Sequence, residues 1–241
     1  MSRSLKYEIP GVDPRVPLSD VAEKGWGSIF ASMPTRRTNV QDEPEGLERT
    51  PRRVLEIGFG RGEFLLAMAG REPETQFIGV EISWKRTLKM ARKVARAKLD
   101  NVRLVDAAAE QAIQLLFEPE SLDAIWINFS DPWPKARHAH RRVIQPGFAG
   151  DAAIALKGSG TLFVATDDVP YAHQIDEVLS AEPRLANCYA PWPFLPEVEG
   201  RTRTGYEEQW RAEGRPMHFF AYRPTADAHV LSHRSESEGS R

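Results

Sequence analysis

The most constraining feature of the chain is an apolar run that ends in closely spaced glycines, Val54-Leu-Glu-Ile-Gly-Phe-Gly-Arg-Gly62. An apolar strand that turns through glycines into a helix is typical of an open α/β sheet, because glycines permit a tight turn and let a ligand approach the backbone. The next apolar run ends at Glu81, about 20 residues after the loop, where an acid can bind a ribose diol. The pattern predicts a nucleotide-like cofactor beside Gly58 and Gly60, at the carboxyl ends of the strands.

The central part of the chain alternates short apolar runs with helical patterns, which predicts βαβ units. The fold class is therefore α/β, a doubly wound and mostly parallel sheet. Strands are expected at 53–57, 76–82, 101–105, 122–128 and 160–166, and helices at 63–70, 83–98, 108–117, 145–157 and 170–181. Residues 122–128 are apolar enough for a central strand. Residues 184–190 and 217–222 are expected to pair in antiparallel fashion at one edge.

Residue composition and hydrophobic pattern divide the chain into an N-terminal extension (1–50), a main domain (51–224) and a polar tail (225–241) that is expected to be disordered. The single cysteine, Cys188, excludes an intrachain disulfide, and we expect it to be buried. No apolar run reaches the roughly 18 residues that span a bilayer. The N-terminus lacks the apolar core of a secretory signal, so we expect a cytoplasmic protein without a membrane anchor. The sequence does not decide between a monomer and a homodimer.

The glycine spacing discriminates between cofactors. A dinucleotide site requires Gly-x-Gly-x-x-Gly, with a pyrophosphate at the helix N-terminus. This chain has Gly58-x-Gly60-x-Gly62 followed by Glu63, an acid that would repel a pyrophosphate. S-adenosylmethionine has no phosphate, and its cationic sulfonium is attracted to carboxylates. The sequence favours S-adenosylmethionine over NAD and leaves open a glycine turn that binds no ligand.

A second cluster follows the predicted central strand, as Asn128-Phe-Ser-Asp-Pro-Trp-Pro-Lys135. Its two prolines restrict the backbone. Trp133 offers a flat face for a base, Asp131 a carboxylate and Lys135 a cation. A rigid loop of this composition suits recognition of an extruded nucleobase. The alternative is a proline-rich turn in which Trp133 packs into the core.

The loop continues into Lys135–Arg142, which holds four Lys or Arg residues, two histidines and no acid. This composition indicates phosphate contacts, although a solvated charge run would look the same. His138 and His140 have no cysteine or acid nearby, so we expect no metal site.

Several segments together resemble the bacterial tRNA (guanine-N7-)-methyltransferases. They are Leu55-Glu-Ile-Gly-Phe-Gly60, Ile78-Gly-Val-Glu81, Asn128–Lys135 with His138 and Arg141-Arg142, Ala165-Thr-Asp167, and Thr204-Gly-Tyr-Glu207. The resemblance extends from Arg53 to Tyr222 and is most specific over Asn128–Arg142. It implies the Rossmann-like fold of S-adenosylmethionine-dependent methyltransferases. It also implies that the target is a guanine in the variable loop of tRNA.

Position by position, the resemblance implies that Glu56 and Glu81 line the S-adenosylmethionine pocket, with Glu81 at the ribose hydroxyls. It places Asp131 between cofactor and guanine, as the catalytic residue. It also implies a set of residues that contact the tRNA substrate, namely Lys135, Asp167, Thr204, Gly205, Tyr206 and Glu207.

One position departs from the family pattern. The family has an Asp-Ala pair after the third strand, whose acid binds the adenine amino group, and here that acid is replaced by Ala108, with Ala109 retained. Asp106 lies two residues earlier and would face away if the strand continues, and Glu110 is another candidate substitute. The backbone at Ala108 and Ala109 could still hold adenine. Losing one hydrogen bond would weaken cofactor binding by roughly 1 kcal/mol.

Guanine N7 carries a free lone pair and no proton, so the predicted reaction needs no general base. Positioning and electrostatics should then provide most of the rate, with Asp131 stabilising the positive charge that develops on guanine. Three alternatives remain: a methyltransferase for an exocyclic amine of a base, a nicotinamide dehydrogenase, and a non-catalytic RNA-binding protein of the same fold.

The net charge of −2 conceals a segregation of basic and acidic residues. Trp84–Lys98 holds seven Lys or Arg residues and Lys135–Arg142 holds four, and neither segment contains an acid. Outside these segments, 21 basic residues face 34 acidic ones. We therefore predict that the basic loop contacts the tRNA backbone, that the basic helix either contributes or is a solvated face, and that binding depends steeply on salt.

Overall fold

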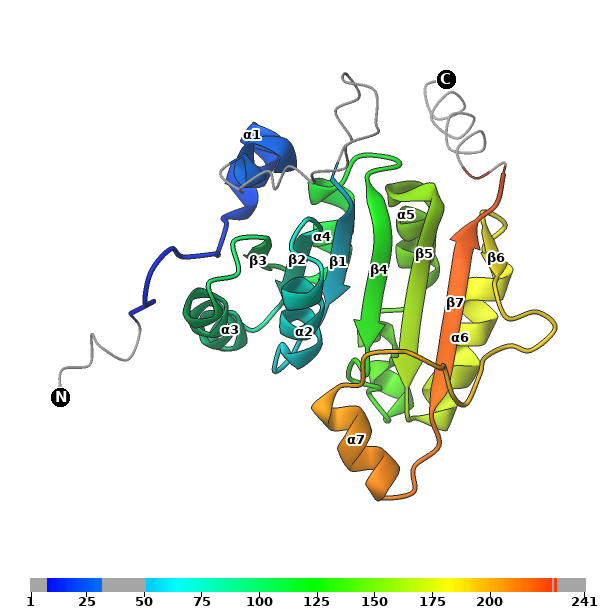
Figure 1. Cartoon of the computed structure of the whole chain (residues 1–241). Helices are drawn as coiled ribbons and strands as arrows, with labels where there is room; N and C mark the ends of the chain where they lie inside the picture. The colour runs from blue at the N-terminus through cyan, green and yellow to red at the C-terminus, as the bar shows by residue number, and fades with distance from the viewer. Residues whose placement is uncertain (1–7, 32–50, 227, 229–241) are drawn as a thin grey trace, which may run out of the picture.

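The computed structural model describes residues 8–31, 51–226 and 228 (Figure 1). In chain order its elements are α1 (Leu18–Phe30), β1 (Arg53–Ile57), α2 (Glu63–Arg71), β2 (Gln76–Glu81), α3 (Trp84–Ala97), β3 (Val102–Asp106), α4 (Ala109–Leu116), β4 (Leu122–Asn128), the 3-10 helix η2 (Ala136–Arg141), α5 (Pro146–Ala155), β5 (Leu156–Thr166), α6 (Val169–Ala181), β6 (Leu185–Asn187), α7 (Gly205–Ala212) and β7 (His218–Pro224). Most of the tail expected to be disordered, 227 and 229–241, lies outside the described residues.

The strands form one seven-stranded sheet in the order β3-β2-β1-β4-β5-β7-β6. The first five strands in this order are parallel, while β7 pairs antiparallel with both β5 and β6. The predicted α/β class, the central place of β4 and the antiparallel edge pair are all confirmed. Strand order reverses between β1 and β4, which creates the switch point where open α/β sheets bind ligands.

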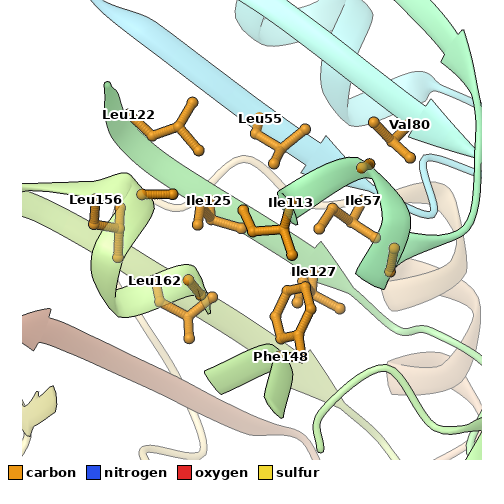
Figure 2. Packing of buried hydrophobic residues seen from close by; sticks show 14 of the residues in the cluster. Leu55, Ile57, Val80, Ile113, Leu122, Ile125, Ile127, Phe148, Leu156 and Leu162 are labelled. Carbon is orange, nitrogen blue, oxygen red and sulfur yellow. The ribbon is translucent and has the colours of Figure 1, made fainter. Parts of the chain in front are cut away.

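Helices cover both faces of the sheet. One apolar cluster joins the sheet to α1, α4, α5 and α6, and a second joins it to α2 and α3. Figure 2 shows part of the larger cluster, in which Ile113 of α4 and Phe148 of α5 lie against Ile125 and Ile127 of β4. Because these strands are buried on both faces, they read as continuous apolar runs rather than alternating ones.

The extension contains structure that its composition did not predict. α1 packs against α4, where the buried Trp26 donates its indole N–H to the carbonyl of Leu116 at 2.7 Å and stacks on Phe117 with ring centroids 5.8 Å apart. Just before it, the chain at Arg15 forms an isolated parallel bridge with Leu104 of β3. Residues 8–31 are therefore built onto the main sheet and its helices.

Two smaller expectations were wrong. Leu156 and Lys157 belong to β5 and not to the preceding helix. Cys188 is exposed, since it lies just beyond the short β6. Within residues 8–31, 51–226 and 228, no helix combines the length and apolarity needed to cross a bilayer.

Candidate active site

A cavity of about 620 Å³ opens at the carboxyl ends of β1, β2 and β4, where strand order reverses. It brings together nine of the residues singled out in the sequence: Glu56, Gly58, Gly60, Glu81, Ala108, Ala109, Asp131, Thr204 and Tyr206. Four others do not line it, namely Lys135, Asp167, Gly205 and Glu207.

The glycine loop turns through three left-handed residues, with φ of 70° at Gly58, 52° at Gly60 and 72° at Gly62. Side chains rarely adopt this conformation, so the sequence needs glycine there. The loop is fixed by buried Glu81, whose carboxylate accepts the amide N–H of Gly60 at 3.2 Å and that of Ser83 at 3.1 Å. Glu81 therefore lies at the cavity wall in a defined orientation.

Glu56, in β1, is buried, and none of the described Lys, Arg or His side chains forms a salt bridge with its carboxylate. One carboxyl oxygen, Oε1, accepts the side-chain N–H of Asn128 at 3.1 Å, while Oε2 is buried and has no hydrogen-bond partner in the structure. Burial raises the pKa of Glu56 to about 7; the Asn128 hydrogen bond, the positive charge of Arg201 and the backbone N–H of Leu65 oppose this rise, and the nearby Glu81 adds to it. A buried acceptor of this kind in a cavity wall is suited to a cationic donor.

The loop after β4 is held in an unusual conformation. Phe129 has a φ of 53° and Trp133 a φ of 45°, which is costly for bulky side chains and typical of functional loops. Phe129 is fixed from both sides, because its amide donates to the carbonyl of Ala165 at 2.8 Å and its ring meets Trp210 edge-on at 5.3 Å. The loop presents the exposed side chain of Asp131 at the cavity.

Arg142 differs from the other basic residues of its segment. It is buried, and its guanidinium donates to the carbonyl of Pro132 and to the side chain of Gln174, both at 2.6 Å. Its assignment to phosphate contact is wrong, because its donors are used to brace the loop. Lys135, Arg137 and Arg141 of this segment are exposed on and beside η2.

Trp133 is half-buried at the rim of the cavity. The guanidinium of Arg141 lies over its ring, 4.9 Å from the centroid, and the His138 ring meets it edge-on at 5.9 Å. The residue is therefore not a plug of the main core. Base stacking on Trp133 stays a prediction, and a base would share the ring with Arg141.

α7 contributes another part of the cavity wall. The Thr204 hydroxyl caps this helix by accepting the amide N–H of Glu207 at 3.0 Å, and the Gly205 amide donates to Glu63 at 2.9 Å. The Tyr206 ring lines the cavity and stacks on Trp210, with centroids 5.3 Å apart. These contacts join α7 to the start of α2 and hold the Tyr206 ring in the cavity wall.

Two of the predicted substrate contacts are occupied by internal partners. Glu207 is 1% exposed and forms ion pairs with Arg201 and Arg211. Asp167, at the end of β5, accepts a hydrogen bond from Arg215 at 2.9 Å. Their contact with substrate stays a prediction, and the structure shows what each carboxylate binds in the free protein.

The position that departs from the family pattern lies in the cavity wall. Ala108 and Ala109 line the cavity at the start of α4, and so does Glu110. Asp106 does not line it; its side chain is exposed at the end of β3. Of the two candidate substitutes for the missing acid, Glu110 is therefore the one that the fold places near the site.

The charge of the wall bears on the ligand it could hold. Acidic side chains outnumber basic ones in the cavity lining: it holds five carboxylates (Glu56, Glu63, Glu81, Glu110 and Asp131) and three guanidinium groups (Arg61, Arg86 and Arg141). With the unpartnered Oε2 of Glu56, this set fits a ligand that carries positive charge and hydroxyl groups, such as S-adenosylmethionine, better than one that carries a pyrophosphate. Within residues 8–31, 51–226 and 228, no group of three His, Cys, Asp or Glu is placed to hold a metal ion.

Sequence reasoning missed Arg61, Trp210 and Arg201. Arg61 lies over the Tyr206 ring at 4.6 Å, and Trp210 supports both Tyr206 and Phe129. Arg61 lies between the glycines of the motif, and the glycine spacing alone gave no reason to select it. Arg201 belongs to a charged loop with no periodic pattern.

A family model with the description "Putative methyltransferase" matches residues 51–220. The chain is similar to a tRNA (guanine-N(7)-)-methyltransferase of Leifsonia xyli subsp. xyli, with 39% identity over 176 residues, 73% of this chain and 78% of the relative. It is also similar to a tRNA (guanine-N(7)-)-methyltransferase of Halorhodospira halophila, with 36% identity over 202 residues, 84% of this chain and 87% of the relative.

Solved structures resemble the fold at lower sequence identity. The 16S rRNA methyltransferase KamB matches with a TM-score of 0.54 and 19% identity, over 72% of this chain and 88% of that protein. The aminoglycoside resistance methyltransferase NpmB1 matches with a TM-score of 0.52 and 19% identity, over 72% and 87%. These likenesses show a Rossmann-like methyltransferase fold.

Proposed function

Because the chain belongs to the tRNA (guanine-N7-)-methyltransferase family, we propose that it transfers a methyl group from S-adenosylmethionine to N7 of a guanine in the tRNA variable loop, forming 7-methylguanosine. The observation that carries this function is the placement of Asp131. It lies on a strained loop at the mouth of a cavity whose inner wall holds Glu56 and Glu81.

The inner wall suits the cofactor. We assign Glu81 to the ribose hydroxyls and Oε2 of Glu56 to the ammonium group of the methionine part, since both residues line the cavity. Ala108 and Ala109 leave the adenine to backbone contacts, with Glu110 near enough to the same wall to replace the missing acid. When bound, S-adenosylmethionine supplies an electrophilic methyl group on a sulfonium.

The protein's part in the reaction is positioning and charge stabilisation. Guanine N7 has an in-plane lone pair and no proton, so Asp131 does not need to act as a base. Its carboxylate offsets the positive charge that grows on guanine as the methyl group is transferred. Tyr206 and Trp133 both line the cavity and provide flat surfaces for the base, which would share these rings with Arg61 and Arg141.

The tRNA backbone is assigned to two basic surfaces beside the cavity. One is the exposed part of η2 and its flanks, with Lys135, Arg137 and Arg141. The other is the polar face of α3, from which Arg86 reaches the cavity wall. Neither Trp84–Lys98 nor Lys135–Arg142 contains an acidic residue, which favours contact with phosphates.

The function is tested by incubating the protein with labelled S-adenosylmethionine and unmodified tRNA, followed by nucleoside analysis. We expect 7-methylguanosine. Label on an exocyclic amine would support the alternative reaction, and absence of label transfer would support a non-catalytic RNA-binding protein. Asp131→Asn, compared with wild type in single turnover, should slow methyl transfer strongly while cofactor binding persists; an unchanged rate would remove Asp131 from the mechanism.

A further inference from the structure

One arginine connects the two halves of the site from within the protein. Arg201, in the loop before α7, is deeply buried, with only 6% of its side chain exposed. Its Nη1 donates to the Glu207 carboxylate, and its Nη2 donates to Oδ1 of Asn128 at 2.5 Å. The rings of Phe219 and Phe129 lie against its guanidinium, 4.8 and 5.9 Å from the ring centroids. These hydrogen bonds and ring contacts hold the guanidinium in one place.

The contact with Asn128 determines how that amide points. Arginine can only donate hydrogen bonds, so Arg201 must meet the amide oxygen of Asn128. The amide nitrogen is then directed to Glu56, to which it donates at 3.1 Å. A continuous chain of contacts therefore runs from Glu207 through Arg201 and Asn128 to Glu56 in the cofactor wall.

The other end of this chain supports the substrate wall. Glu207 lies in the first turn of α7, directly after Tyr206, and Arg211 of the same helix donates to its second oxygen at 3.1 Å. Holding Glu207 thus holds the turn that presents Tyr206 to the cavity. Glu207 itself does not line the cavity.

We propose that Arg201 is a positioning residue for methyl transfer: one buried guanidinium orients Asn128 and Glu56 on the cofactor side and anchors Glu207 and α7 on the tRNA side. Glu207 then acts through Arg201 and not by touching guanine. The proposal rests on the proposed function, in which Glu56 binds S-adenosylmethionine. Under this proposal, the coupling of the two binding walls depends on Arg201, a loop residue outside every recognisable motif.

Electrostatics supports the same assignment. Around Glu56, the charged groups with a direct influence are Arg201, which lowers its pKa, and Glu81, which raises it. Removing the Arg201 cation should leave Glu81 as the remaining charged group that shifts the pKa of Glu56. Glu56 would then be protonated over a wider pH range and would bind a cationic ligand less well.

Arg201→Met tests the proposal, with Arg203→Met as the matched control. Arg203 lies two residues away in the same loop, but it is exposed and pairs with the exposed Glu197 at 3.3 Å. Binding of S-adenosylmethionine is measured by calorimetry without tRNA, from about pH 6 to pH 8.5, on protein shown by thermal unfolding to be folded. Arg201→Met should lose about tenfold or more in affinity at pH 8, because a charged hydrogen-bond network is removed. It should also shift the pH dependence of binding upward, whereas Arg203→Met should stay within about twofold of wild type.

Folded Arg201→Met that binds the cofactor within about twofold of wild type at every pH would overturn the proposal. If this variant does not fold, Arg201→Lys, which keeps the charge and loses the planar fork, should show a smaller loss in the same direction; wild-type affinity in Arg201→Lys would then overturn it. Wild-type protein that fails to bind S-adenosylmethionine would instead refute the proposed function.

Glu207→Gln separates a positioning role from direct contact with guanine. If Glu207 acts through Arg201, its substitution should weaken cofactor binding in the absence of tRNA. If Glu207 touches guanine, cofactor affinity should stay at the wild-type value while kcat/KM for tRNA falls, and the assignment of Glu207 given above would be wrong.

Discussion

Glu56→Gln should stabilise the cofactor-free protein at pH 8 while weakening its affinity for the cofactor. Burial raises the pKa of Glu56 from the usual 4.5 to about 7 in the folded protein. A raised pKa means that the folded state holds the proton more tightly than the unfolded state does. The resulting stability is fully present below about pH 4.5 and is lost as the pH rises through about 7.

The size of the effect follows from the two pKa values. With 4.5 unfolded and about 7 folded, the ionisation of Glu56 lowers the free energy of unfolding by about 2.5 kcal/mol between pH 5 and pH 8. Gln cannot ionise, but its amide oxygen can still accept from Asn128. The stability difference between Glu56→Gln and wild type should therefore grow by about 2.5 kcal/mol over this range.

Urea unfolding of cofactor-free protein at pH 5, 6, 7 and 8 measures this difference. Glu74→Gln, which removes an exposed carboxylate away from the cavity, is the control and should show no comparable trend. A stability difference between Glu56→Gln and wild type that is the same at pH 5 and pH 8 would refute the reasoning. Calorimetry should show in parallel that Glu56→Gln binds S-adenosylmethionine more weakly, since the site keeps a destabilising charge in order to bind a cation.

Other expectations concern packing and charge. Gly79→Ala should destabilise the fold by about 1–3 kcal/mol, because a Cβ there would lie 2.7 Å from Leu65 and 2.8 Å from Phe59; Gly70→Ala, with no atom within 4 Å, should be neutral or stabilising in the same thermal unfolding assay. Trp26→Ala should cost about 3–5 kcal/mol in urea unfolding, and a loss below about 1 kcal/mol would show that α1 is dispensable. Neutralising three exposed cations of α3 should lower the slope of log K for tRNA against log salt by about 2–3 without changing cofactor affinity, and an unchanged slope would remove α3 from the footprint. The three are Lys85, Lys89 and Arg96.

The sheet could be predicted because its signals are local. β1 and β4 have the boundaries expected from their apolar runs, since a strand covered on both faces must be apolar throughout and ends where glycine or polar residues begin. α1 could not be predicted, because its segment is rich in Pro, Gly and charge, and Gly25 interrupts it with a φ of 67°. What holds α1 is its packing on α4, a contact distant in sequence.

The site residues also divide into those that local sequence signals predict and those that they do not. Glu56, Glu81 and Asp131 stand at the ends of strands, so strand boundaries fix where they lie, and the cavity contains all three. Arg201 comes from a loop without periodicity and reaches Asn128 across 73 positions of sequence. Arg142 was predicted to contact phosphate because its neighbours are basic. In the structure its guanidinium instead donates a hydrogen bond to the Pro132 carbonyl and stabilises the loop.

The nearly neutral chain concentrates its acidic and basic residues in different parts of the site. Five carboxylates line the cavity, against the three guanidinium groups of Arg61, Arg86 and Arg141, while the other cations of α3 and η2 lie outside it. The acidic wall should repel a phosphate backbone and attract a sulfonium, and the basic surfaces should do the reverse. The two ligands of the proposed reaction would then be sorted by charge before any specific contact forms. What enters the acidic cavity from the tRNA should be a single base, which carries no phosphate, and we propose that this base meets the methyl donor beside Asp131.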